Sequence, residues 1–454
     1  MAEIDKSLPN EVRTEVQLPA EEVVEEEVTE QQGPVEVTPE EDGGVTLNFE
    51  PGAVNVPGTE NHFDNLADIL PDDILDPIGN DMVNNYMDYK LSRKDWEQSY
   101  IQGLDLLGFK YENRTEPFQG ASGATHPVMA EAVTQFQAQA YKELLPSDGP
   151  VRTQIIGTKN PATEQQATRV KDFMNYLIMD QMKEYEAEFD SMLFHLPLAG
   201  STFKKVYYDD LLGRAVSKFI PAEDLIVPYT ATSLDDAESI IHTIKISEND
   251  LRKQQVGGFY SDIDLGPPGP DTNNELTKKE RQLEGTKKTG RQENMYTLLE
   301  CHVNLDLEGF EDKDDELNPT GIKLPYVVTV DETSQQVLSI RRNYNPTDPK
   351  RNKIHYFVHF KFLPGLGFYG FGLIHMIGGL SRTATAALRQ LLDAGTLSNL
   401  PAGFKQRGVR VRDEASPIQP GEFKDVDAPG GNLREAFFPL PYKEPSQTLL
   451  NLLG

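Results

Sequence analysis

The feature that most constrains the fold is one slender helix predicted over residues 370–397. Apolar residues recur there at spacings of 4, 3, 4, 4 and 3, which places them on one face of an α-helix. The apolar stripe comprises Leu373, Ile377, Leu380, Ala384, Leu388 and Leu391, and a polar stripe on another face comprises Arg382, Thr385, Arg389 and Asp393. Many Gly, Ala, Ser and Thr residues keep the helix thin, so neighbouring helices can approach it closely. The pattern is equally compatible with a helix repeated side by side in a ring and with a buried helix of one domain.

The rest of the chain alternates between helical and strand-like segments. Periodicities of three and four residues predict helices over about 82–107, 126–145 and 163–194. Segments rich in β-branched and aromatic residues predict strands at 202–208, 215–220, 225–227, 239–245, 296–305, 326–330, 336–341, 355–362 and 404–411. Between them, residues 256–294 have the Gly, Pro and Lys content of a linker or a partly helical surface segment. The 454 residues are enough for two or three domains.

Charge is unevenly distributed along the chain. The formal net charge is −30, and residues 1–70 contain 18 acidic residues but only 2 basic ones. With little aromatic content to bury, these residues are predicted to form a disordered acidic arm. The remainder is also acidic, which argues against a conventional nucleic-acid-binding domain, because such domains use Lys and Arg to neutralise phosphates. An acidic wall is nevertheless compatible with DNA that slides past without sticking.

The composition also restricts the location of the protein. No run approaches the roughly 18–20 apolar residues of a membrane span, and the N-terminus lacks the features of a secretory signal. The single cysteine, Cys301, excludes an internal disulfide framework. We therefore expect a protein made in a cytoplasm, with no membrane attachment.

The segment Gly365-Leu366-Gly367-Phe368-Tyr369-Gly370 has the G-x-G-x-x-G spacing of a dinucleotide-binding turn. Such a turn places a pyrophosphate at the N-terminus of the following helix. Here Leu363-Pro364 separates the strand from the first glycine, and no second strand ending in an acidic residue follows. We interpret the glycines as a tight turn into a packed helix, the turn comprising Gly365, Gly367, Gly370 and Gly372. A nucleotide-binding enzyme that uses this loop remains the alternative.

Two other motifs favour structural roles. Residues 304–309, followed by Asp315, faintly resemble a calcium loop, but a strand precedes them and an Asp replaces the closing Glu. His355 and His359 lie four apart in a strand-like segment with no Cys or Asp ligand nearby. The sequence also lacks the Gly-x-Ser-x-Gly, Gly-Lys-Ser/Thr and His-Glu-x-x-His motifs. We therefore predict no catalytic residues, no metal and no cofactor.

Four blocks in a fixed order connect the chain to a known family. They are residues 195–209 (HLPLAGSTFKKVYYD), residues 219–227 (FIPAEDLIV), Asp235-Asp236-Ala237 with Ile241-His242, and the turn and helix over 367–397. Each block is weakly specific alone, whereas the ordered set is fairly specific. With these blocks, residues 80–454 resemble phage portal proteins, the head-to-tail connectors, and particularly the large portals of short-tailed phages.

This resemblance implies a fold and an assembly. The expected fold class is α+β, with a helix-rich α/β wing, a helical stem and a small β-rich clip. The resemblance assigns residues 71–290 to the wing, with 256–290 leading to the stem, then 291–362 to the clip, 363–398 to the stem helix and 399–454 to a return to the wing. A crown and barrel are expected beyond residue 454. Portal resemblance further implies a homo-oligomeric ring, a dodecamer, at the unique portal vertex of the virion capsid.

The implied function is passive and non-enzymatic. The ring would pass double-stranded DNA during genome packaging and ejection, with non-specific, phosphate-directed contacts. It would dock the terminase large subunit and later the head-completion or tail adaptor proteins, and it would contact the major capsid and scaffolding proteins. Arg382, Thr385, Arg389 and Asp393 are expected to face the DNA channel or a neighbouring subunit. Another capsid-associated structural or adaptor protein is the second alternative.

Overall fold

The structure of the 454-residue chain is a computed structural model. It describes residues 36–39, 45–48, 61–209, 212–269, 275–286, 295–313, 318–399, 403–405, 410–411, 426–427, 437–439 and 444–453. The chain divides into two units, residues 1–59 and 60–454. In the first unit, β1 (Glu36–Pro39) pairs antiparallel with β2 (Val45–Asn48). The rest of the predicted disordered arm up to residue 60 lies outside the described residues.

The acidic arm does not extend to residue 70, because residues 61–70 belong to the core of the second unit. The short 3-10 helix η1 (Leu66–Asp68) packs there, with Leu66 fully buried and Leu70 8% exposed. Asn65 anchors this segment, since its side-chain oxygen accepts a 2.9 Å hydrogen bond from the amide of Ile340. Residues 61–70, although they contain acidic residues, therefore pack against a strand that is distant in the sequence.

The first predicted helix, over 82–107, consists of α1 (Asp72–Ser92), α2 (Lys94–Leu104) and the 3-10 turn η2 (Asp105–Leu107). Arg93 separates α1 from α2 and is buried. Its Nη1 donates to the carbonyls of Ala222 and Leu225, both at 3.0 Å, and its Nε lies 2.9 Å from Glu97. These contacts attach the junction of the two helices to the strands beneath.

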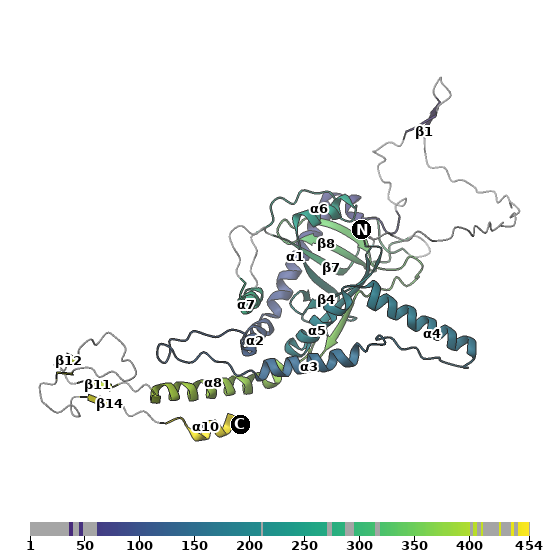
Figure 1. The fold of residues 1–454 in the computed structure, drawn as a ribbon. Helices are drawn as coiled ribbons and strands as arrows, with labels where there is room; N and C mark the ends of the chain where they lie inside the picture. The colour runs from purple at the N-terminus through teal and green to yellow at the C-terminus, as the bar shows by residue number, and fades with distance from the viewer. Residues whose placement is uncertain are drawn as a thin grey trace, which may run out of the picture. The chain divides into compact units, whose positions relative to one another are not determined.

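The main sheet has five antiparallel strands in sequence order. They are β5 (Leu225–Ile226), β6 (Ser239–Ile246), β7 (Tyr296–Leu305), β8 (Leu324–Asp331) and β9 (Val337–Arg342). Helix α1 packs against this sheet through Val83 and Tyr86, and Cys301 is fully buried in the same core (Figure 1). The expected boundary at residue 291 therefore runs between paired strands, because every residue of β6 pairs with β7. It does not separate two folded bodies.

A second sheet has three strands, in the order β10 (Phe357–Lys361), β3 (Ser201–Asp209) and β4 (Arg214–Pro221). Helix α5 (Tyr185–Ala199) packs on β3 and β4, and α3 (Val128–Leu144) packs on α5. Two shorter helices, α6 (Glu248–Val256) and α7 (Glu275–Glu284), lie within or next to the predicted linker. The α7 side chain of Leu276 is fully buried, so this part of the linker packs onto the fold.

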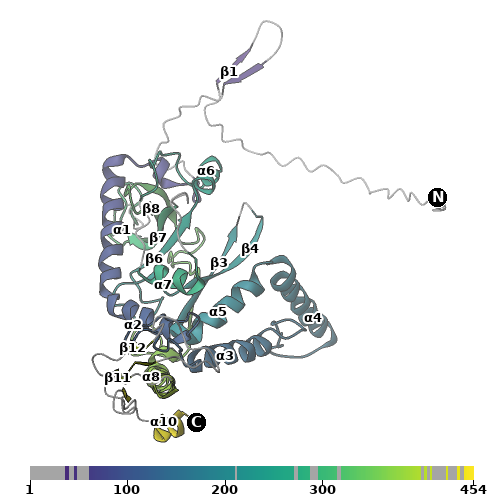
Figure 2. The same cartoon turned by 60° about the vertical axis from the view of Figure 1, so that its left-hand side comes forward.

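The single helix predicted over 163–194 is two helices in the structure. Helix α4 (Pro161–Tyr176) passes into one π-helical turn, η3 (Leu177–Gln181), and the chain then breaks at Met182, whose φ and ψ are −85° and 76°. The Met182 side chain is buried, so the residue at the break packs into the fold. In Figure 2, α4 runs away from α5 and the strands.

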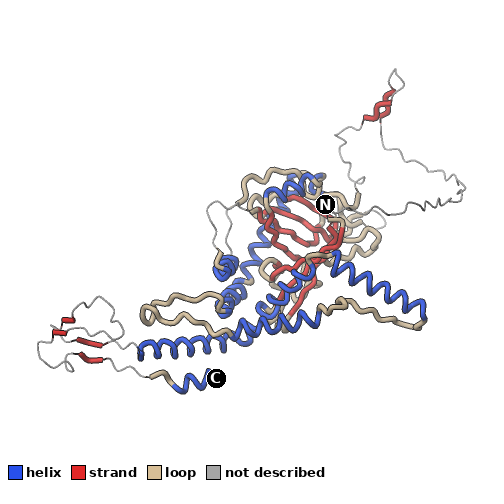
Figure 3. Tube along the Cα trace, in the orientation of Figure 1, coloured by secondary structure: helices blue, strands red, loops and turns tan. Residues whose placement is uncertain are grey.

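The last long element is α8 (Leu373–Asn399), a helix of 27 residues (Figure 3). After it, β11 (Gly403–Lys405) pairs with β14 (Phe437–Pro439), and β12 (Arg410–Val411) pairs with β13 (Val426–Asp427). Helix α10 (Gln447–Leu453) packs beside α8. Among the described residues, no helix combines the length and apolar character that crossing a membrane requires.

Candidate functional site: a groove along helix α8

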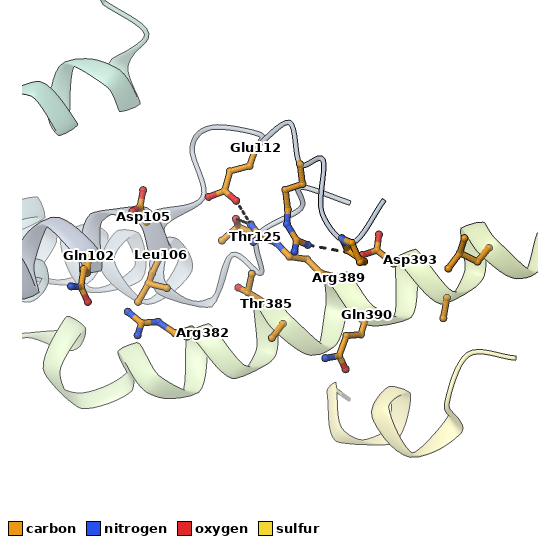
Figure 4. Close-up of a pocket in the computed structure, with 15 residues that line it drawn as sticks. Gln102, Asp105, Leu106, Glu112, Thr125, Arg382, Thr385, Arg389, Gln390 and Asp393 are labelled. Carbon is orange, nitrogen blue, oxygen red and sulfur yellow. Dashed lines mark hydrogen bonds and ion pairs between the residues drawn. The ribbon is translucent and has the colours of Figure 1, made fainter. Parts of the chain in front are cut away.

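An open cavity of about 810 Å³ lies between α8 and residues 105–127, which comprise η2 and the loop after it and are called the 105–127 loop below (Figure 4). We call this cavity the α8 groove. All four residues of the predicted polar stripe line it, namely Arg382, Thr385, Arg389 and Asp393. The structure therefore brings these residues together on one face, as the helical spacing predicts. Their individual contacts decide which of them can meet a partner.

Two of the four bind backbone amides of the loop. Asp393 Oδ1 accepts a 2.6 Å hydrogen bond from the amide of Ser122, and Thr385 Oγ1 accepts a 3.1 Å bond from the amide of His126. Arg114 Nη1 lies 4.0 Å from the Asp393 carboxylate, at the limit of an ion pair. These side chains hold the loop on the helix, because they supply acceptors to otherwise unpaired backbone donors.

Arg389 is also engaged within the chain. Its Nε donates to the Ala124 carbonyl at 2.7 Å, and its Nη2 donates to Thr125 Oγ1 at 3.3 Å. The same guanidinium lies 3.0 Å from the Glu112 carboxylate. A guanidinium committed to three partners is poorly placed to bind anything outside the subunit.

Arg382 differs from the other three. Its side chain is exposed near Gln102 and Leu106, and it makes no hydrogen bond or ion pair with the described part of the chain. It is therefore the residue of the predicted stripe that is open to a partner.

The polarity of α8 does not decide which side of the helix is buried. Thr385 and Asp393 are 7% and 9% exposed, whereas Leu380, from the predicted apolar stripe, is 67% exposed beside Met376 at 56%. Thr385 and Asp393 are buried under the loop, and each accepts a hydrogen bond from one of its amides. Sequence periodicity reports which residues share a face, but it cannot report that a loop more than 250 positions away covers that face.

The glycine turn before α8 packs on the end of α5. A Cβ on Gly370 would lie 2.5 Å from the Gly200 carbonyl oxygen, and one on Gly372 would lie 2.4 Å from that of Leu198. A Cβ on Gly365 would meet the Tyr369 carbonyl oxygen at 2.2 Å, whereas Gly367 faces open space. Close backbone contact is thus the reason for three of the four glycines.

Three amides at the end of this turn also have acceptors within the chain. Gly370 donates to Ser201 Oγ at 2.7 Å, Phe371 to the Leu363 carbonyl at 2.8 Å, and Gly372 to His375 Nδ1 at 3.1 Å. A pyrophosphate at this turn would need such amides as free donors. The contacts therefore favour the packed turn over the nucleotide-binding alternative.

The other motifs do not form a shared site. His355 lies before β10 and pairs with Asp235 at 3.5 Å, whereas His359 lies on β10, 3.1 Å from Ser201 Oγ and against Phe203. Asp315, the closing residue of the calcium-like segment, lies outside the described residues. Within the described ranges, no three His, Cys, Asp or Glu side chains are grouped so that they could hold a metal ion.

Sequence reasoning missed a buried ion pair between the two sheets. Lys205 on β3 donates to Glu300 Oε1 on β7 at 2.6 Å, and His302 Nε2 lies 2.8 Å from the same oxygen. Burial raises the pKa of Glu300, but Lys205 and His302 outweigh it, so the pKa lies well below its usual range. The sequence could have indicated this pair, because a Glu and a His lie two residues apart on a strand whose other side chains are largely apolar.

Comparison with known proteins gives one family. A model of the phage SU10 portal protein family matches residues 211–454, more than half of the chain. The match contains β4 and the elements that follow it, including the α8 wall of the groove. No curated protein matches the chain.

Proposed function

Because the chain belongs to the phage SU10 portal protein family, we propose that it forms the ring at the unique capsid vertex through which double-stranded DNA enters and leaves. Portal proteins are structural components of the virion, so the chain is a capsid-associated, oligomeric protein of a bacteriophage. The family match over residues 211–454 carries the proposal. The ring is a dodecamer in this proposal, and it catalyses no reaction.

Helix α8 is the stem helix in this proposal. Its support is the length of 27 residues, its place directly after the packed glycine turn, and the exposure of Leu380 and of Arg382 on two different sides of the helix. The shared sheet restricts which strands the clip can contain more than the resemblance implies. If β7, β8 and β9 form the clip, then β5 and β6 belong to it too, because all five share one sheet.

We assign partners to surfaces that are exposed in the described part of the subunit. Arg382 contacts DNA phosphates or the neighbouring subunit, whereas Thr385, Arg389 and Asp393 hold the loop. The terminase large subunit, and later the head-completion or tail adaptor proteins, dock on the clip. The major capsid and scaffolding proteins surround the ring. Any DNA contact is non-specific, because a channel needs no base readout.

Negative-stain electron microscopy of the purified full chain tests the assembly. We expect rings of about twelve subunits with a central hole as wide as a DNA duplex. Discrete monomers or dimers would overturn the ring. A ring that fails to bind the terminase large subunit would instead favour the other structural class, an adaptor.

The role of Arg382 is tested separately with Arg382→Glu. The matched control is Gln390→Glu, which also places a negative charge on an exposed position of the groove but removes no arginine. Loss of rings only in Arg382→Glu assigns the residue to the subunit contact. Intact rings with slower terminase-driven DNA packaging assign it to the channel. If neither changes relative to the control, Arg382 has no role in either.

A further inference from the structure

Helix α4 carries an apolar stripe that the described chain leaves uncovered. Val170, Phe173 and Met174 follow the i, i+3, i+4 pattern of one helical face, and Leu177, the half-buried first residue of η3, continues it at i+7. Val170 is 54% exposed, Phe173 60% and Met174 37%, and no residue of α4 is buried. We call these four residues the α4 stripe.

The stripe is the free side of a helix that is otherwise held in place. Asn175 accepts a 2.9 Å hydrogen bond from the Val151 amide and donates to the Asp148 carbonyl at 3.2 Å. Thr153 Oγ1 donates to the Ala167 carbonyl at 3.1 Å. The segment before α4 therefore runs along the side of the helix that carries Ala167 and Asn175, and it leaves the stripe next to that side exposed. Its exposure is a property of the folded subunit.

The N-terminus of α4 is also well defined. Asn160 and Thr163 form reciprocal caps, with the Asn160 side chain 2.8 Å from the Thr163 amide and Thr163 Oγ1 3.0 Å from the Asn160 amide. A capped helix that projects a Phe and a Met has the composition of an interface core, which is rich in aromatic residues and Met. Contiguous exposed apolar surface of this kind marks a contact site in a protein that assembles.

Charge identifies the kind of surface that the stripe meets. Residues 150–183, which include α4, contain five basic and three acidic residues, in a chain of formal net charge −30. The α4 region is thus a positively charged part of a strongly acidic protein. An acidic surface with exposed apolar residues would complement it, and the chain itself has one.

Helix α1 supplies this complementary surface. It contains five Asp and one Lys, and it exposes Met87 at 53% and Leu91 at 67%, one helical turn apart. In Figures 1 and 2, α1 and α4 lie on opposite sides of the strands. Two different patches on opposite sides of a subunit are what a head-to-tail ring contact needs.

We propose that the α4 stripe packs on Met87 and Leu91 of α1 in a neighbouring copy of this chain. The inference rests on the proposed ring, but the family match does not assign it, because α1 and α4 both precede residue 211. Phe173 is the central residue, since large aromatic side chains dominate the binding energy of interface cores.

Cysteine cross-linking between copies tests the pairing. The natural Cys301 is fully buried, so introduced cysteines react alone. Full-length Phe173→Cys and Leu91→Cys are mixed and treated with a short bismaleimide, alongside each variant by itself. We expect a covalent dimer in the mixture only. A dimer from Phe173→Cys alone would mean that α4 pairs with α4, and it would overturn the proposal.

Electron microscopy of the same samples tests the α4–α1 contact and the closed ring separately. Rings without a cross-link would overturn the α4–α1 contact and leave the portal ring standing. Neither rings nor a cross-link would overturn both. A cross-link in the mixture without rings would support the contact and count against the closed ring.

A second variant tests the energetic role of the stripe. Phe173→Ser should weaken self-association at least about 10-fold by mass photometry, because it removes the central aromatic residue. The matched control is Gln165→Ser, at an exposed polar position on the same helix. The melting temperature of the subunit should not change, since Phe173 is exposed. Equal association of the two variants would overturn the proposal, as would a loss of DNA binding without any loss of association.

Discussion

Asp393 on α8 accepts a 2.6 Å hydrogen bond from the backbone amide of Ser122, a residue 271 positions earlier in the chain. With the bond from the His126 amide to Thr385, it attaches the loop over 105–127 to α8. The Asp393 side chain is 13% exposed, so water competes weakly for this amide. The polar stripe of α8 therefore shapes the groove before it meets any partner.

The first prediction concerns this contact. Asp393→Ala should lower the free energy of unfolding by about 1.5–3 kcal/mol, because it removes a charged acceptor from a mostly buried amide. Hydrogen exchange in peptides covering residues 112–126 should become faster. Gln390→Ala, at an exposed position of the same helix, is the control and should leave exchange unchanged. Wild-type exchange in Asp393→Ala would show that the loop is held elsewhere.

The second prediction concerns the glycine turn. Gly372→Ala should destabilise the fold by several kcal/mol, because its Cβ would lie 2.4 Å from a backbone oxygen that cannot move aside. Gly367→Ala should be nearly neutral, since nothing lies within 4 Å of the added Cβ. Urea denaturation of the two variants measures the difference. If Gly367→Ala were the more damaging, the packed-turn interpretation would fail.

The third prediction concerns the buried pair between the sheets. Lys205→Met should cost about 3–5 kcal/mol, because it leaves the Glu300 carboxylate charged and without its main partner. The additional change Glu300→Gln should recover part of this loss. Lys218→Met, at an exposed position paired with Lys205 in register on β4, is the control. A double variant no more stable than Lys205→Met would argue against the ion pair as the cause.

The fourth prediction concerns pH. Burial lowers the pKa of His195 to about 4, and burial likewise lowers the pKa of His242 to about 3. In the unfolded chain a His titrates near 6.5. Below that pH the unfolded state therefore binds protons that the folded state does not bind. The free energy of unfolding falls as pH drops from about 6.5 toward these folded-state pKa values.

Replacing one of these histidines should reduce this dependence. His195→Phe, in a site already lined by Phe194 and Phe219, should remove about one proton from the uptake on unfolding. Urea unfolding at pH 7, 6 and 5 gives the uptake from the slope of the unfolding free energy. An unchanged slope would mean that His195 is protonated in the folded state.

Local pattern was sufficient for much of the fold. The strand predicted at 202–208 is β3 (Ser201–Asp209), the strand at 239–245 is β6 (Ser239–Ile246), and the helix at 370–397 is α8 (Leu373–Asn399). Alternation and helical spacing predict these elements because they depend on side chains within a few residues of one another. The same spacing placed Arg382, Thr385, Arg389 and Asp393 on one face, which the groove confirms.

The sequence by itself determined the type and approximate place of most elements, the shared face of α8 and the resemblance that led to the portal family. Only the tertiary structure decided that Asp393 binds the loop while Arg382 remains open, that Met182 ends the run from α4 into α5, and that Glu300 meets Lys205. The reason is physical: these outcomes depend on partners brought together by the packing of distant segments. Periodicity within one segment carries no information about which backbone amide or charge will lie against it.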